Sequence, residues 1–442
     1  MWGKRYLTII GRITIIKSFG ISLFIYLMQS IGIGAENLKK INTIIHRFIW
    51  NPHASRDKKV TEKIKREILT KSYEQGGMNM IDLVKLQDSF LLKWADRFLS
   101  SSRDSWKDTA SIFFEKVGGI SAFRSDLVSA DFKGLNLINN MFWKKVLTTW
   151  LNYKNSATIK TFLAPSILEP IFNNSKVKFK NQVLFNSKCI RLRLLYISDF
   201  LYRGDIISFN QFNIIFENSA DSLLVYNSIY NALSRYNNHF KTEYENRSHA
   251  LSYKDTFRDM EAGKIDRKIL YNIIRCSKIE PIKELWLERF PLDKDDSRVW
   301  SIARNNCSET KIVELQWKIL HAIYPSGVLL HKMKIRNNET CEFCGERDTL
   351  PHFFVSCSVA KAAWDEADKL LSGILGRKCV LSEKNKILGI LEDDNLFRKE
   401  SAKKVNKIIL VCKRSISKFK YEKAGDVRLL FENQLLFRGL LD

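Results

Sequence analysis

The chain has 442 residues, of which 45% are hydrophobic and 27% are charged. This balance supplies enough apolar material for packed cores, and the length predicts two to four domains of roughly 100–200 residues each. The 72 lysines and arginines exceed the 48 aspartates and glutamates, which gives a formal net charge of +24. Such an excess favours a polyanionic partner, first of all nucleic acid, over a soluble basic protein with no specific partner. Eight cysteines without an even framework argue against a disulfide scaffold and predict a reducing location, nuclear or cytoplasmic.

The N-terminal segment imitates a secretory signal. Lys4, Arg5, Arg12 and Lys17 precede an uncharged run at residues 18–35. The basic part is already interleaved with apolar residues, however, and serine, glycine and glutamine dilute the run. It also falls short of the roughly 20 predominantly apolar residues of a membrane span. We therefore expect a buried core helix here.

Periodicity predicts a mainly α chain. Apolar residues recur at helical spacing at residues 38–49, 83–98, 313–324, 359–370 and 405–419. Asp82 and Ser358 precede two of these segments as plausible N-caps, and Pro325 ends another. Strand signals are few and short.

Positive charge is concentrated in two stretches. Residues 36–71 contain ten basic and four acidic residues, and residues 398–428 contain eleven basic and three acidic ones. A basic helix face suits the phosphate backbone of nucleic acid, whereas a solvated face and an acidic membrane surface are the alternatives. The predicted nucleic-acid contacts are Lys39, Lys40, Arg47, Lys58, Lys59, Lys63, Lys65, Arg66, Lys403, Lys404, Lys407, Lys413, Arg414, Lys418 and Lys420.

One 17-residue window gathers Cys341, Cys344, His352 and Cys357. Three thiolates and an imidazole at this spacing form a complete tetrahedral shell for Zn²⁺, with no open position for water or substrate. Gly345 follows the second cysteine, where a positive φ turns backbone amides towards the sulfurs. The alternative is a chance cluster of buried thiols. The sequence thus predicts a structural zinc site.

Eight sequence blocks in a fixed order make the chain recognisable. The first comprises Trp2, Arg5, Leu7, Thr8, Gly11, Arg12, Ile16 and Lys17. The others are Phe48-Ile49-Trp50-Asn51, Gly76-Gly77-Met78, Lys93-Trp94-x2-Arg97, Phe142-Trp143-Lys144, Gln316-Trp317-Lys318-x-Leu320-His321, Leu330-His331-Lys332-Met333, and the cysteine cluster with Trp364. Together they resemble the part of non-LTR (LINE-type) retrotransposon reverse transcriptases that follows the polymerase palm. The resemblance covers essentially the whole chain.

The resemblance implies a thumb-like helical region at 1–150, a helical connector at 151–300 and a zinc-knuckle-containing helical C-terminal domain at 301–442. In the family these parts grip template RNA and target DNA during target-primed reverse transcription. The expected partners are therefore RNA and DNA through largely sequence-independent contacts, with no membrane and no disulfides.

The catalytic signature of the family was not found. Its polymerase holds two Mg²⁺ ions on an aromatic-x-Asp-Asp hairpin. The only Asp-Asp pairs here, Asp295-Asp296 and Asp393-Asp394, lie in polar surroundings without that aromatic residue. We therefore expect no catalytic residues and no enzymatic activity from this chain alone, as in a 5′-truncated copy. The alternative to a nucleic-acid-binding fragment is a non-functional structural relic of a truncated retroelement.

A few residues depart from the pattern or remain open. Pro351 stands before the ligand histidine, where the family commonly has an acidic residue. Trp364 is the one tryptophan for which stacking on single-stranded nucleic acid stays an option. We expect the other histidines not to bind metal, and Cys189, Cys276, Cys307, Cys379 and Cys412 to be core thiols.

Overall fold

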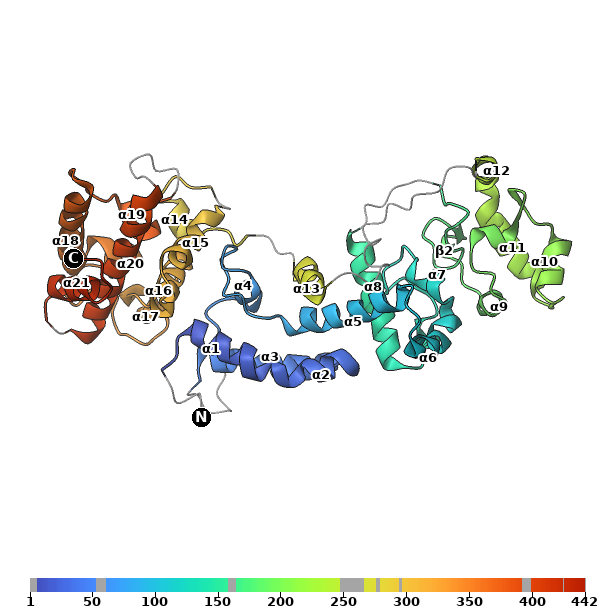
Figure 1. The fold of residues 1–442 in the computed structure, drawn as a ribbon, viewed down its shortest axis with the longest axis horizontal. Coiled ribbons are helices and arrows are strands. Elements are labelled where there is room, and N and C mark those ends of the chain that lie inside the picture. Colours follow the sequence, from blue (N-terminus) through green and yellow to red (C-terminus); the bar gives the residue numbers. More distant parts are fainter. Residues whose placement is uncertain are drawn as a thin grey trace. The chain divides into compact units, whose positions relative to one another are not determined.

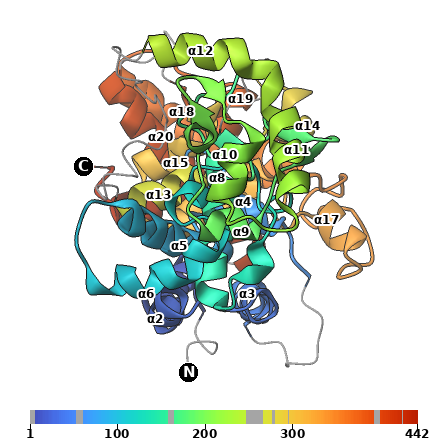
Figure 2. The same ribbon diagram turned by 90° about the vertical axis from the view of Figure 1, so that its right-hand side faces the viewer.

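The computed structural model describes residues 6–52, 61–157, 164–246, 266–275, 279–293, 296–391, 399–423 and 425–441. Within them the chain is mainly helical, as predicted, with two small antiparallel hairpins (Figures 1 and 2). The chain forms two compact units. Unit 1 combines Met1–Phe24, Glu36–Asp82 and Ser277–Asp442, and unit 2 combines Ile25–Ala35 and Leu83–Cys276. These units cut across the expected ranges 1–150, 151–300 and 301–442, because N-terminal segments pack with the C-terminal part.

Unit 1 holds the helices around the cysteine–histidine cluster, coloured orange to red in Figure 1. Its elements are α1 (Ile9–Ile15), the π-helix η2 (Ile16–Gly20), α3 (Ala35–Trp50), α4 (Arg66–Thr70), α14 (Glu284–Leu287), α15 (Ser297–Asn306), α16 (Thr310–Leu320), α17 (Gly327–Lys332), the π-helix η7 (His352–Ser356), α18 (Ser358–Leu375), α19 (Glu383–Leu388), α20 (Lys399–Glu422) and α21 (Val427–Leu436). Helix α20 packs on α15, α16, α18 and α21. The helices expected at 38–49, 83–98, 313–324, 359–370 and 405–419 are confirmed, although the third already ends at Leu320.

The N-terminal segment of unit 1 is fixed to elements far along the sequence. The Thr8 hydroxyl caps α1 by accepting a hydrogen bond from the Gly11 amide at 3.0 Å. The Ile9 amide donates to the carboxylate of Glu314 on α16. The Arg12 guanidinium donates to the Ile49 carbonyl of α3 at 2.5 Å. Residues of the first sequence block therefore cap and dock α1.

The Gly76 carbonyl joins the loop before α5 to α16. It accepts hydrogen bonds from Trp317 Nε1 at 2.9 Å and His321 Nε2 at 2.8 Å. Burial lowers the pKa of His321 to about 4, so its ring is neutral at pH 7. Gly77 approaches so closely that a Cβ there would lie 2.0 Å from the Lys71 carbonyl oxygen. Two sequence blocks separated by more than 200 residues are thus the two sides of one contact.

Unit 2 contains two hydrophobic cores. Its elements are α5 (Leu83–Leu99), α6 (Ser105–Phe114), η3 (Glu115–Val117), α7 (Ile120–Phe123), η4 (Leu135–Leu137), α8 (Met141–Ala157), β1 (Lys178–Phe179), β2 (Gln182–Val183), α9 (Ser187–Arg191), η5 (Ile197–Phe200), β3 (Leu201–Tyr202), β4 (Asp205–Ile206), α10 (Phe209–Ile215), α11 (Ser222–Leu233), η6 (Ser234–Tyr236), α12 (Asn237–Glu245) and α13 (Arg267–Arg275). The first core includes residues of α5, α6, α8 and α13, and the second extends from residue 167 to residue 240. Figure 2 shows α10 and α11 of the second core side by side.

Aromatic residues from two sequence blocks meet beside the first core. The Trp94 ring makes edge contacts with Trp106 at 5.0 Å and with Phe142 and Trp143 at 5.8 Å. The Arg97 guanidinium lies 4.9 Å from the Trp94 ring centre. These tryptophans pack in the protein, as predicted.

The uncharged run at residues 18–35 does not form the expected buried helix. The chain makes a π-turn that ends at Gly20 and then α2 (Ser22–Ser30), of which only Met28 is buried. Its large exposed side chains include Leu23, Tyr26 and Leu27, with 74%, 75% and 43% exposed. Among the described helices none is by itself long and apolar enough to cross a membrane. The helices at Ile9–Gly20 and Ser22–Ser30, which meet at a bend of 50°, are long and apolar enough only when taken together.

Candidate metal centre

A tight backbone turn presents the first two cysteines. The Cys341 amide donates to the Glu346 carbonyl at 2.7 Å, and the Gly345 amide donates to the Cys341 carbonyl at 2.9 Å. Gly345 has φ +76°, the left-handed conformation that favours glycine, as predicted. The Thr340–Arg347 bridge closes the turn from outside. Cys341 and Cys344 are thereby held on one side of a short knuckle.

The other two candidate ligands flank a single π-helical turn. His352 begins η7, and the Cys357 amide donates to the His352 carbonyl at 3.0 Å. Cys357 is the N-cap of α18, a position that the sequence assigned to Ser358. The wide turn brings the imidazole and the last thiol to the same point, facing the knuckle.

The four side chains meet with the spacing of a tetrahedral site. The Cys341 and Cys357 sulfurs are 3.7 Å apart, the Cys344 and Cys357 sulfurs 4.0 Å apart, and Cys344 Sγ is 3.2 Å from His352 Nε2. All four donor atoms lie within 4.8 Å of one another. Zinc–sulfur bonds of about 2.3 Å at tetrahedral angles place sulfurs about 3.8 Å apart. The pairs are also far beyond disulfide length. The donor set therefore fits Zn²⁺.

A carboxylate orients the histidine. His352 Nδ1 lies 3.1 Å from Glu346 Oε2, while Nε2 faces the sulfurs. Such an outer carboxylate fixes the tautomer of a metal-binding imidazole. Burial lowers the pKa of His352, which favours the neutral ring that a ligand must be. Glu346 thus supplies a negative charge next to His352, although the residue directly before this histidine is Pro351 and not an acidic one.

A buried lysine lies beside the cluster. Lys420 on α20 is 7% exposed, and apart from the nearby Cys357 thiol its ammonium has no polar partner among the described residues. It sits 4.1 Å from the Phe353 ring centre. A buried cation without a counter-charge is costly. Zinc with three thiolates and a neutral imidazole carries one net negative charge, which would supply that counter-charge.

The two buried thiols respond differently to these surroundings. Burial raises the pKa of Cys341 to about 11. Burial alone would also raise the pKa of Cys357, but the nearby Lys420 ammonium outweighs it, so the pKa of Cys357 is lowered. Lys420 therefore favours the thiolate at the ligand that starts α18.

Aromatic packing attaches the cluster to the rest of unit 1. The Tyr324 ring contacts Phe353 at 5.2 Å and Phe354 at 4.9 Å, and its hydroxyl is 2.7 Å from the Ser417 hydroxyl. Trp364 is fully buried, and its Nε1 donates to the Phe354 carbonyl at 2.6 Å. Because the Trp364 ring is enclosed in the protein, the option that it stacks on nucleic acid is wrong.

The predicted nucleic-acid contacts fall into four groups. Lys39, Lys40, Lys63, Lys65, Lys403 and Lys404 are exposed, and Arg47, Arg66, Lys407, Arg414 and Lys418 are half-buried. Lys58 and Lys59 lie outside the described residues. Lys413 and Lys420 are buried, so their assignment to an exposed basic face is wrong. The face of α20 that carries them is covered by other helices.

Lys413 has a defined structural role. It is 1% exposed and donates to Gln316 Oε1 at 2.5 Å and to the Ile387 carbonyl at 2.9 Å. Burial lowers the pKa of Lys413 to about 7. It therefore links α16, α19 and α20 through polar contacts in a dry interior.

Of the remaining cysteines that the structure describes, three are core thiols as predicted and one is not. Cys189, Cys307 and Cys412 are buried and free, whereas Cys379 is only partly buried. Asp296 caps α15 by accepting from the Arg298 amide at 3.0 Å. Cys276, Asp295 and the pair Asp393-Asp394 lie outside the described residues.

Sequence reasoning missed two partners of the cluster. Glu346 reaches His352 only because the knuckle turns back on itself. Lys420 was assigned to a solvent-facing helix side, and 63 residues of sequence separate it from Cys357. Only Glu346 could have been suspected from the sequence, because it directly follows Gly345 in the turn that carries the first two cysteines.

Comparison with known proteins agrees with this geometry. Residues 274–364 match a family described as zinc-binding in reverse transcriptase. The matched range contains all four cluster residues. No curated protein shows significant similarity to the chain. The C-terminal region of this chain is therefore related to reverse transcriptases and carries a zinc-site-like Cys3His cluster.

Proposed function

We propose that this chain is a nucleic-acid-binding, C-terminal part of a LINE-type retrotransposon reverse transcriptase, with a structural zinc site and no catalysis of its own. The observation that carries the proposal is the tetrahedral Cys341, Cys344, His352 and Cys357 cluster inside the range that matches zinc-binding in reverse transcriptase. Four protein ligands leave no open position, which supports a structural role. A reducing compartment, nuclear or cytoplasmic, suits a site whose ligands are thiolates.

Basic side chains support an RNA or DNA partner. Lys39, Lys63 and Lys65 are exposed in unit 1 near α3 and α4, and Lys403 and Lys404 are exposed at the start of α20. Contacts of this kind neutralise phosphates and release counterions without reading sequence. The chain should therefore bind single-stranded RNA and DNA of different sequences with similar affinity.

Binding of the full chain to dye-labelled RNA and DNA strands, measured by fluorescence anisotropy over a salt series, tests the proposal. The logarithm of affinity should fall linearly with the logarithm of salt, with a slope of about −0.7 for each phosphate contact. Lys403→Glu with Lys404→Glu should weaken binding and flatten the slope. Lack of binding at low salt would sink the proposal.

Catalytic silence has its own test. Primer extension on an RNA template with Mg²⁺ and deoxynucleotides should give no product, because the sequence contains no aromatic-x-Asp-Asp string. Extension by the purified chain that is lost on Asp296→Asn would contradict this part, since it would give a catalytic role to a residue that caps α15.

A second candidate is a structural relic that no longer works by itself. The exposed apolar side chains of α2, including Leu23 and Tyr26, favour it, because a large exposed apolar patch normally has a partner. Sedimentation of the full chain distinguishes the two. A relic should aggregate and bind no strand, and Leu23→Glu with Tyr26→Glu should restore solubility without restoring binding.

A further inference from the structure

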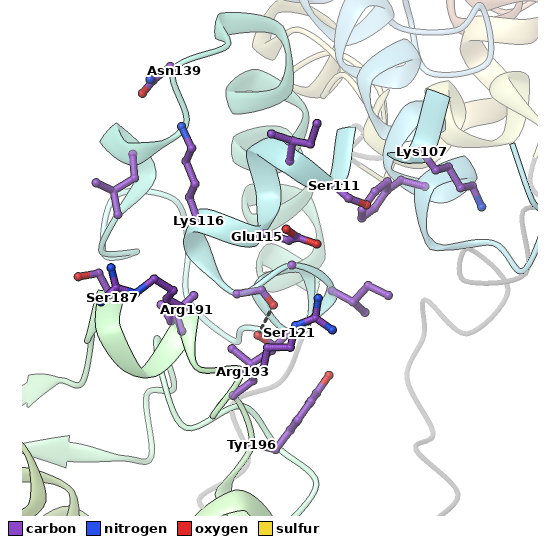
Figure 3. Close-up of a pocket in the computed structure, with 18 of the residues that line it drawn as sticks. Lys107, Ser111, Glu115, Lys116, Ser121, Asn139, Ser187, Arg191, Arg193 and Tyr196 are labelled. Carbon is purple, nitrogen blue, oxygen red and sulfur yellow. Dashed lines mark hydrogen bonds between the residues drawn. The ribbon is translucent and has the colours of Figure 1, made fainter. Parts of the chain in front are cut away.

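Unit 2 contains a pocket of about 1120 Å³ that no part of the zinc site touches. Its walls come from the ends of α5 and α6, the turn η3, the loop after η4, and α9 with the segment behind it. Figure 3 shows Lys116 on η3, Arg191 on α9, and Arg193 and Tyr196 on the following segment. The volume is at the upper end for pockets that bind small ligands, so a chain segment fits better than one small molecule.

The lining of the pocket is strongly basic. Five cationic side chains, Lys107, Lys116, Lys188, Arg191 and Arg193, face one carboxylate, Glu115. Lys107 donates to the Ser100 carbonyl, and Lys188 pairs with Glu217 at 3.6 Å. Lys116, Arg191 and Arg193 are exposed and have no ion pair within the described part of the chain. Three cations are therefore free to meet a polyanion.

Arg193 is held in a backbone conformation that costs free energy. Its φ is +59°, and its amide donates to the Ile190 carbonyl at the end of α9. Glycine occupies such a helix end without strain, whereas a residue with a Cβ is disfavoured there. Lys180 and Arg203 also have a positive φ in this unit, so the conformation alone assigns no role to Arg193. Its guanidinium lines the pocket, and glycine can replace it there without strain.

One aromatic ring of the pocket is available for stacking. Phe98 packs inward on Phe114 and Phe123, at 4.9 and 5.3 Å between ring centres. Tyr196 is half-buried and contacts no other ring within the described residues. Nucleic-acid sites combine cations for the backbone with rings on which bases stack.

We propose that the pocket binds a segment of single-stranded nucleic acid, with phosphates on Lys116, Arg191 and Arg193 and a base on Tyr196. This deepens the proposed function by adding a second contact region, in unit 2, where neither basic stretch of the sequence lies. Hydroxyl and amide groups from Ser111, Ser187 and Asn139 also line the pocket and can take sugar and base contacts.

Arg193→Gly tests the proposal without endangering the fold, because glycine relieves the positive φ. Arg203→Gly is its matched control, since Arg203 also has a positive φ, of 53°, is exposed, and lies in the β3–β4 hairpin outside the pocket. Both variants remove one positive charge from unit 2. Binding of a short labelled oligothymidine strand to the full chain is measured by anisotropy over a salt series.

Arg193→Gly should weaken binding a few-fold and reduce the salt slope by about 0.7, while Arg203→Gly leaves the slope unchanged. Tyr196→Leu, which keeps an apolar side chain, should weaken binding about fivefold through lost stacking and leave the slope unchanged. Equal effects of the two glycine variants would overturn the pocket. So would competition by poly-glutamate as strong as that by unlabelled oligothymidine. If the wild-type chain bound no strand, the proposed function would fail as well, whereas wild-type binding unaffected by Arg193→Gly overturns the pocket alone.

Discussion

At the scale of single residues, charge is balanced around the cysteine–histidine cluster from two directions. Glu346 brings a carboxylate to His352, and Lys420 brings an ammonium to the thiols. Both groups act on the ligands from outside the first coordination sphere. Partners of this type commonly change metal affinity by about 10–100-fold when they are removed.

Lys420→Met should lower the affinity of the chain for Zn²⁺ by about tenfold. Methionine keeps the contact with Phe353 but removes the charge that compensates the anionic site. Competition with a chromophoric chelator measures the effect. Lys418→Met is the control, because Lys418 lies on the same helix, is half-buried, and already pairs with Glu422 at 3.6 Å. Equal zinc affinity of both variants would contradict the role of Lys420.

Lys413 predicts a pH dependence of stability. Its pKa is lowered from 10.5 to about 7, so between these values the unfolded chain binds more protons than the folded chain. Unfolding free energy contributed by this group therefore rises with pH across that window and is lowest below pH 7. Lys413→Met should remove the rise, as followed by urea unfolding at several pH values between 7 and 10.5. An unchanged slope would mean that Lys413 is charged in the fold.

The residues that could be predicted are those whose chemistry is written in local spacing. Cys341, Cys344, His352 and Cys357 lie within 17 residues, and Gly345 follows from the knuckle they make. Lys413 and Lys420 look no different from Lys403 in sequence. Only the packing of helices on α20 distinguishes the buried lysines from the exposed ones.

At the scale of elements, periodicity predicted where helices form but not which faces are covered. The stripe Val405, Ile408, Cys412 and Ile416 marks α20 correctly. Because α15, α16, α18 and α21 pack on that helix, two residues of its expected basic face, Lys413 and Lys420, are buried. The opposite error occurred in α2, whose apolar residues lie on the surface. A periodic pattern shows where the apolar stripe of a helix lies. How many of its faces are buried depends on how many other helices pack on it, which the pattern does not show.

Two glycines in unit 1 should respond in opposite ways to alanine. Gly77→Ala places a Cβ against the Lys71 carbonyl and should destabilise the loop between α4 and α5 by about 3 kcal/mol. Gly373→Ala should stabilise α18 by about 0.5–1 kcal/mol, because a Cβ there meets nothing within 4 Å. Urea unfolding followed by circular dichroism compares them. Similar shifts would contradict the close approach at Gly77.

At the scale of the whole molecule, the candidate metal site and the two hydrophobic core clusters lie in different units. Unit 1 holds the Cys3His cluster, and unit 2 holds two apolar cores without a comparable cluster among its described residues. The division could not be read from the sequence, because unit 1 is assembled from three separate segments. The sequence blocks give the order of the segments along the chain, but they do not show which segments pack together.

Removal of zinc should therefore loosen only part of the chain. Chelation by EDTA should speed amide hydrogen exchange in η7, α18 and α20, since structural zinc binding contributes folding free energy. Exchange in α5 and α8 should not change. Hydrogen-exchange mass spectrometry of the full chain resolves these peptides, and a uniform loss of protection would show that the units do not respond separately.

The contact between Gly76 and α16 has a consequence for synthesis in the cell. Trp317 follows Gly76 by 241 residues, and Glu314 follows Ile9 by 305. At about 5–20 residues per second, a ribosome needs on the order of ten to sixty seconds to make that length. During this interval α1 and the Gly76 loop have been translated but their partners on α16 have not, and the whole of unit 2 is completed before α16. The residues of α1 that pack on α16 therefore have no such partner until the last third of the protein has been made.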